Sequence, residues 1–270
     1  MTTTGDQDVV DTRPAYLERR GHVGVVWLNR PKALNAVNSA MCTAAGEALE
    51  EITADPELRV CVITGAGEAF SSGADLKALA AGEKIRAEGH PEWGFAGIVC
   101  HYIPKPVIAA VNGFALGGGT EILLACDLAV IDETAPLGLP EVKRGLMAGA
   151  GGMLRLNKQI PQKIALEMAF TGEPINAETA KAWGLVNRVA PVGQALSCAL
   201  DLAEVIVGNA PVAVQVSKRI MHRMGRVDSD WDPDLWELSR QGLTEVVKSK
   251  DAREGPRAFV EKRAPVWTGQ

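Results

Sequence analysis

Asn112-Gly113-Phe114-Ala115-Leu116-Gly117-Gly118-Gly119-Thr120-Glu121 is the most informative stretch of the chain, because it joins a strand to a helix through three consecutive glycines. The apolar run at 106–111 predicts a buried strand, and residues 122–126 predict a short buried helix. Glycine lacks a Cβ, so a glycine amide at the start of a helix can approach a ligand and offer an unused N–H. The positive end of the helix dipole lies behind that amide, which therefore suits an oxyanion.

Strand and helix patterns alternate through the first half of the chain, and helices dominate the last third. Strands are predicted at Val23–Leu28, 60–64, Val107–Val111 and 128–131. Helices are predicted at 39–53, 162–170, 176–183, 195–208, 211–224 and part of 233–263. The alternation indicates an α/β core, and the final segments indicate a helical extension.

Composition narrows the class of protein. A chain of 270 residues with 47% hydrophobic residues can bury a full core, and its net charge of −5 disfavours nucleic acid as the main partner. Five scattered cysteines without a Cys-x-x-Cys pair indicate a reducing compartment and no zinc site. The polar start lacks a signal peptide, and no later stretch predicts a membrane span. We therefore expect a cytoplasmic protein whose residues 1–13 form a loose tail.

Two glutamates next to turns indicate acid/base chemistry. Glu121 ends the glycine segment, and Glu141 follows Leu139-Pro140. A further turn at 69–77 follows the predicted strand 60–64, so its amides lie near the carboxyl end of a strand, where ligands of α/β folds gather. The segment 80–104 mixes glycines with charged residues, and we expect it to form a mobile loop over the site.

Five motifs in order and spacing resemble the crotonase (enoyl-CoA hydratase/isomerase) superfamily. They are Asn29-Arg30-Pro31-Lys32-Ala33-Leu34-Asn35-Ala36, the turn 69–77, the segment 112–121, Leu139-Pro140-Glu141 and Gly149-Ala150-Gly151-Gly152. The similarity runs from about residue 16 to 263, including the ending Ala258-Phe259-Val260-Glu261-Lys262-Arg263. It covers nearly the whole chain.

The resemblance implies a crotonase-like spiral of ββα repeats over 14–200 and a helical C-terminal trimerisation region over 201–270. It also implies a homotrimer or a dimer of trimers that binds an acyl-coenzyme A thioester. Two backbone amides form the shared oxyanion hole of the superfamily, and by motif position these are Ala74 and Gly118. Further substrate contacts are implied at Lys32, Ala33, Asp75, Leu76, Lys77, Phe259 and Lys262.

Glu121 and Glu141 occupy both acid/base positions of the hydratases in this superfamily. There, Glu121 would deprotonate the water that attacks C3, and Glu141 would exchange the C2 proton. The leading hypothesis is reversible hydration of a trans-2-enoyl-CoA to a 3-hydroxyacyl-CoA in fatty acid β-oxidation, without metal or redox cofactor. The alternatives are a dehydratase of a carnitinyl-CoA-like substrate, an enoyl-CoA isomerase and a non-catalytic acyl-CoA binder. A serine hydrolase is disfavoured, because Ser71 and Ser72 lie in no Gly-x-Ser-x-Gly elbow.

Overall fold

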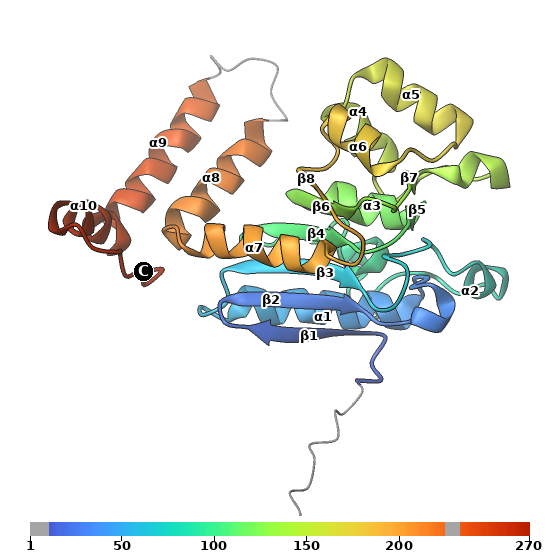
Figure 1. Cartoon of the computed structure of the whole chain (residues 1–270), viewed down its shortest axis with the longest axis horizontal. Helices are drawn as coiled ribbons and strands as arrows, with labels where there is room; N and C mark the ends of the chain where they lie inside the picture. The colour runs from blue at the N-terminus through green and yellow to red at the C-terminus, as the bar shows by residue number, and fades with distance from the viewer. Residues whose placement is uncertain (1–10, 225–232) are drawn as a thin grey trace, which may run out of the picture.

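The computed structural model describes residues 11–224 and 233–270, so most of the predicted N-terminal tail lies outside the described residues. A six-stranded sheet in the order β1-β2-β3-β4-β6-β8 forms the centre (Figure 1). Its only antiparallel pair is β1 with β2, and the other neighbours run parallel. The strands are β1 Ala15–Arg20, β2 Val23–Leu28, β3 Val60–Gly65, β4 Val107–Val111, β6 Leu128–Asp132 and β8 Arg188–Ala190.

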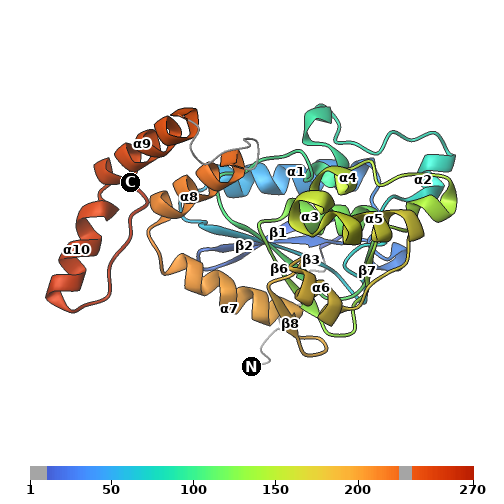
Figure 2. The same ribbon diagram turned by 90° about the horizontal axis from the view of Figure 1, so that it is seen from above.

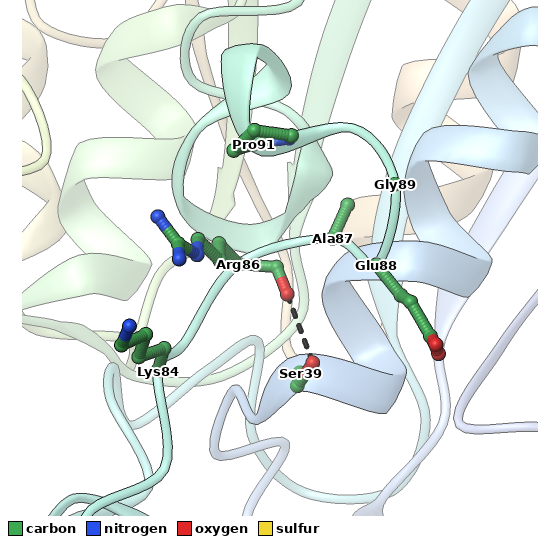
Figure 3. Close-up of a pocket in the computed structure, with 7 residues that line it drawn as sticks. All are labelled: Ser39, Lys84, Arg86, Ala87, Glu88, Gly89 and Pro91. Carbon is green, nitrogen blue, oxygen red and sulfur yellow. Dashed lines mark hydrogen bonds between the residues drawn. The ribbon is translucent and has the colours of Figure 1, made fainter.

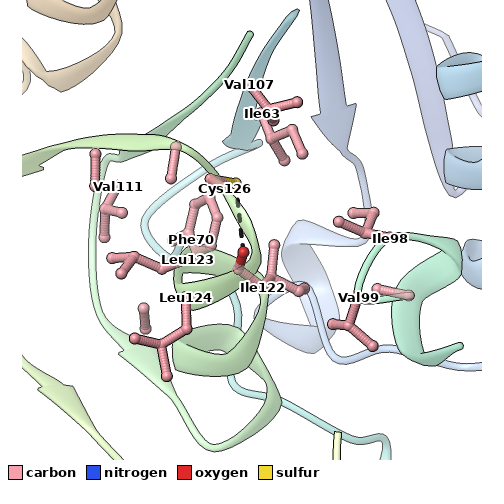
Figure 4. Close-up of a cluster of buried hydrophobic side chains, with 14 of the residues drawn as sticks. Ile63, Phe70, Ile98, Val99, Val107, Val111, Ile122, Leu123, Leu124 and Cys126 are labelled. Carbon is pink, nitrogen blue, oxygen red and sulfur yellow. Dashed lines mark hydrogen bonds between the residues drawn. The ribbon is translucent and has the colours of Figure 1, made fainter. Parts of the chain in front are cut away.

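Both faces of the inner strands β3, β4 and β6 are buried, which explains why these strands read as continuous apolar runs. Alternate residues of β3 face opposite sides: Cys61 and Ile63 belong to one core cluster, and Val60 and Val62 to the other. Helix α1 (Ser39–Ala54) packs on the first side, and α7 (Ala195–Val207) covers the second (Figure 2). Figure 4 shows part of the first cluster around helix α3 (Gly118–Ala125).

A second, smaller sheet crosses the carboxyl ends of the parallel strands. Strands β5 (Ala115–Leu116) and β7 (Leu137–Gly138) pair in parallel. Single bridges extend this sheet from Ser71 to Ala115 and from Leu137 to Ile175. Each turn of the chain thus contributes one long strand and one short strand, followed by a helix. The predicted crotonase spiral is confirmed.

The remaining helices surround one end of the sheet or extend away from it. Around the carboxyl ends of the strands lie η1 Pro31–Ala33, α2 Leu76–Ala80, η2 Pro91–Trp93, η3 Phe95–Gly97, η4 Pro140–Arg144, α4 Gly152–Gln159, α5 Gln162–Thr171 and α6 Ala177–Trp183. Helices α8 Pro211–Met224, α9 Pro233–Lys248 and α10 Asp251–Glu261 reach out from the opposite end (Figures 1 and 2). An ion pair between Lys218 Nζ and Asp127 Oδ2 at 2.8 Å ties α8 to the core.

The structure differs from the sequence predictions in two places that matter for the site. Helix α3 begins at Gly118, four residues earlier than predicted, because Gly117 turns the chain with φ 55° and the next two glycines enter the first helical turn. The predicted boundary after residue 200 falls inside α7, whose Ala199, Ala203 and Val207 are buried against the sheet. The helical extension therefore begins at α8.

No single helix among residues 11–224 and 233–270 is long and apolar enough to cross a membrane. Helices α7 and α8 pass the same test only as a pair, and they are bent by 107° at their junction.

Candidate active site

The turns that follow β3 and β4 lie side by side at the carboxyl ends of these strands. Leu116 N–H donates to Ser71 O at 3.1 Å, and Ser71 N–H donates to Phe114 O at 3.3 Å. A Cβ on Gly119 would lie 2.3 Å from Ser71 O, so only glycine permits this approach. The predicted turn 69–77 and the glycine segment are therefore brought together, although they are far apart in the sequence.

The Ala74 amide points away from Val37, the residue with which Ala74 forms a single β-bridge. Val37 pairs with Ala74 through two bonds: Val37 N–H donates to Gly73 O at 2.8 Å, and Asp75 N–H donates to Val37 O at 2.9 Å. Successive amides of an extended chain point to opposite sides. The N–H of Ala74 therefore faces away from Val37, and within the described part of the chain it donates to no protein acceptor.

Gly118 presents its amide beside the same turn. A Cβ on Gly73 would lie 2.9 Å from Gly118 N and 2.9 Å from Leu116 O, so the backbones of residues 73 and 118 are in contact. As the first residue of α3, Gly118 has an N–H that the helix does not use, and none of residues 11–224 or 233–270 accepts from it. Phe95 from η3 contacts Gly118, where a Cβ would lie 2.4 Å from the ring.

Glu121 points from the first turn of α3 toward the start of α4. Its side chain is 3% exposed, and its Oε1 accepts the Gly152 N–H at 2.8 Å. Burial raises the pKa of this carboxyl to about 7, and the nearby charge of Glu141 adds to the shift. The Gly152 N–H and the Arg155 guanidinium oppose it.

Glu141 lies in η4, directly after Pro140. A Cβ on Gly117 would lie 3.1 Å from Glu141 Oε1, so this carboxyl lies over the residue that precedes the Gly118 amide. Its Oε2 is buried and has no hydrogen-bond partner among the described residues. Burial raises the pKa of Glu141 as well. Two carboxyls with raised pKa values thus lie beside the glycine segment that carries the Gly118 amide.

The other residues implied by the resemblance have different positions. Asp75 caps α2 by accepting from Lys77 N–H and Ala78 N–H, and Arg30 Nη1 donates to its Oδ2 at 2.9 Å. This ion pair holds the turn that carries Ala74. Ala33 is half-buried in η1, whereas Lys32, Leu76 and Lys77 are exposed. These residues border the Ala74 turn, and their contacts with coenzyme A stay a prediction.

Phe259 and Lys262 are not brought to this site within the chain. Both lie at the end of α10, far from α3 in both ribbon views, and Phe259 is 85% exposed (Figures 1 and 2). Their predicted contact with coenzyme A therefore requires a neighbouring subunit, as the resemblance implied, and it stays a prediction.

The segment 80–104 contains the two short helices η2 and η3 and lies next to the site. Its outer part borders a cavity of about 300 Å³, where the Ser39 hydroxyl donates to Arg86 O at 2.9 Å (Figure 3). None of the four predicted catalytic residues lines this cavity, so it is separate from the candidate site. Closure of this segment over a substrate stays a prediction.

The sequence profile of the family described as enoyl-CoA hydratase/isomerase matches residues 18–270. The chain belongs to this family. Membership confirms the resemblance inferred from the motifs, and the family acts on acyl-CoA thioesters.

Relatives within the enoyl-CoA hydratase/isomerase family carry two kinds of name. Carnitinyl-CoA dehydratase of Salmonella typhi is 44% identical over 261 residues, covering 94% of this chain and 98% of that protein. The crystal structure of enoyl-CoA hydratase from Mycobacterium tuberculosis H37Rv matches with a TM-score of 0.89 and 43% identity, covering 96% of this chain and 100% of that one. Carnitinyl-CoA hydratase from Mycobacterium avium matches with a TM-score of 0.77 and 53% identity over the same shares.

Two side chains at the site escaped the sequence analysis. Phe95 lies in the predicted loop 80–104, and nothing in its sequence context distinguishes it from a core residue. Arg155 follows the Gly151-Gly152 motif by three residues and was not singled out. A basic residue one helical turn after a glycine pair is a weak signal, because most such residues are exposed.

Proposed function

We propose that the chain catalyses the reversible hydration of a 2-enoyl-CoA to a 3-hydroxyacyl-CoA. The observation that supports this most directly is the presence of two carboxyls with raised pKa values beside the glycine segment, the buried Glu121 and the half-buried Glu141. The amides would hold the thioester oxygen and stabilise the enolate charge that develops there. A single carboxylate would suffice for isomerisation, and a binder would need neither.

Each carboxyl has one task in the proposed reaction. Ionised Glu121 takes a proton from water as the oxygen attacks C3, and the electron pair of the double bond moves toward the thioester. Protonated Glu141 then gives its proton to C2, so one proton enters and one leaves the pair. Dehydration is the same path in reverse: Glu141 removes the C2 proton, and Glu121 protonates the departing hydroxyl.

Two substrate classes fit this site. A trans-2-enoyl-CoA is the first candidate, and its place would be fatty acid β-oxidation. A carnitinyl-CoA-like hydroxyacyl thioester is the second, and the relatives named for it favour this candidate, since they reach 53% identity with this chain. The absorbance of the conjugated thioester distinguishes the two substrate classes. It is lost when a 2-enoyl-CoA is hydrated and gained when carnitinyl-CoA is dehydrated, so a chain-length series of 2-enoyl-CoAs should be compared with carnitinyl-CoA.

We expect turnover of at least one of these thioesters in this assay. Conversion of a 3-enoyl-CoA to its 2-enoyl isomer without hydration would instead identify an isomerase. Saturable binding of every thioester without turnover would identify a non-catalytic binder.

The pH dependence of turnover provides a prediction from the same pair. In the proposed reaction, the pair formed by Glu121 and Glu141 is active only when it carries one proton. The rate should therefore rise as pH increases through the lower apparent pKa of the pair and fall above the higher one. Because burial raises both pKa values and that of Glu121 reaches about 7, both limbs of the profile should lie at higher pH than the titration of a free carboxyl. The pH profiles measured for hydration and for dehydration should show the same two apparent pKa values. Constant turnover between pH 5 and pH 9 would contradict the assignment of the pair.

The proposed reaction uses amides, carboxyls and water, and it needs no metal or redox cofactor. In residues 11–224 and 233–270, no group of three or more His, Cys, Asp or Glu side chains is placed to hold a metal ion. We expect dialysis against a chelator to leave turnover unchanged. Loss of turnover that is restored by one added metal would overturn this part of the proposal.

The proposal also includes a homotrimer or a dimer of trimers, which sedimentation can test.

A further inference from the structure

Arg155 lies at the junction of three parts of the site, and the acid/base scheme assigns it no task. It belongs to α4, one turn after the residue whose amide holds Glu121, and it is only half-buried. Its backbone N–H donates to Gly151 O at 2.9 Å. A Cβ on Gly151 would lie 2.2 Å from Arg155 Nη1, so the guanidinium folds back against the start of its own helix.

The guanidinium also holds the segment that contacts Gly118. Arg155 Nη2 donates to Val99 O at 2.5 Å. Val99 N–H donates in turn to Phe95 O at 3.1 Å, and the Phe95 ring contacts Gly118. Val99 is buried in the core beside Ile98 (Figure 4). One hydrogen bond thus connects α4 to the turn whose aromatic ring contacts Gly118.

Charge gives Arg155 a second effect on the same site. The charged groups that act on Glu121 are Glu141 from η4 and Arg155 from α4. Lys143 and Arg144 of η4, and Lys163 and Glu167 of α5, are exposed to solvent, which screens them. The charge of Arg155 therefore lowers the pKa of Glu121, in addition to the larger effect of the backbone hydrogen bonds from Gly152 and Ala150.

We propose that Arg155 is a positioning residue, which docks the 95–99 turn against the Gly118 amide and places a positive charge beside Glu121. This inference rests on the proposed hydration reaction. The docking keeps water away from the oxyanion hole, and the charge keeps Glu121 able to accept a proton near neutral pH. Neither effect requires Arg155 to touch the substrate.

Two substitutions separate these effects. Arg155→Met removes the charge and the hydrogen bond, so we expect turnover to fall at least ~10-fold and the acidic limb of the pH profile to move to higher pH. Arg155→Lys keeps the charge but loses the planar fork, so turnover should fall while the acidic limb stays in place. Lys163→Met, which removes an exposed positive charge from α5, is the control and should change neither.

A titration without substrate tests the inference independently of the reaction. Carboxyl carbons of ¹³C-labelled glutamate are followed by NMR in the full chain, and the Glu121 signal is assigned by its loss in Glu121→Gln. We expect Glu121 in Arg155→Met to titrate at a higher pH than in the wild type. If the wild type turns over no enoyl or hydroxyacyl thioester, the proposed function fails, but this titration still tests Arg155.

An unchanged Glu121 titration in folded Arg155→Met would overturn the electrostatic part. Wild-type turnover in Arg155→Lys would overturn the docking part. If Arg155→Met does not fold, Arg155→Lys decides the inference, because a purely structural role predicts lower thermal stability with an unchanged kcat in the folded fraction.

Discussion

Glu121→Gln is expected to lower turnover of the preferred CoA thioester by at least ~100-fold, since general acid/base catalysis commonly contributes 10²–10⁴. Glutamine keeps the shape of the side chain and can still accept the Gly152 N–H through its amide oxygen. It cannot exchange a proton with water. The loss should therefore fall on kcat and leave binding of the thioester largely intact. Steady-state kinetics of the purified variant provide the measurement, and near wild-type kcat would show that Glu121 is not the base.

The same substitution should make the protein more stable at alkaline pH. The folded chain raises the pKa of Glu121 from 4.5 to about 7, so its stabilising effect is complete below pH 4.5 and is lost as pH rises toward 7. Above pH 7 this loss amounts to at most about 3 kcal/mol. Removing the ionisable group removes the loss, so thermal unfolding at pH 8 should move to higher temperature in Glu121→Gln. Glu47→Gln, on the exposed face of α1, should match the wild type in turnover and stability.

Gly73→Ala is expected to lower turnover by about 10²–10³, the effect of losing one oxyanion donor. The added methyl group would lie 2.9 Å from both Gly118 N and Leu116 O, and neither backbone atom can move without displacing the glycine segment. The two donor amides would then separate or tilt, and both act on the same oxygen. We expect kcat to fall while Glu121 and Glu141 remain in place.

A matched glycine separates this effect from backbone strain. Gly73 has φ +89° and Gly82 has φ +80°, so alanine is strained at both positions by roughly 1–2 kcal/mol. A Cβ on Gly82 meets no atom within 4 Å. Gly82→Ala should therefore carry the backbone strain without the clash and keep wild-type turnover. Equal kcat values for the two folded variants would contradict an oxyanion role for the Ala74 and Gly118 amides.

The sequence determined the family, the order of the main elements and the segments that form the site. Its inner strands are continuous apolar runs because both of their faces are buried, and this pattern is local and readable. Glycines at 73, 118 and 119 were informative for the same reason: each occupies a backbone position that leaves no room for a Cβ. Both glutamates were identifiable because charged side chains are rare in apolar stretches.

Only the tertiary structure decided what surrounds those residues. Three interactions join segments that are distant in sequence. The Phe95 ring contacts Gly118, Arg155 donates a hydrogen bond to Val99 O, and the Gly152 N–H donates one to Glu121. The raised pKa of Glu121 is also a product of folding, because burial and the approach of Glu141 do not exist in the unfolded chain. Sequence patterns report local backbone and burial preferences, whereas the electrostatics of a site depend on distances that only packing fixes.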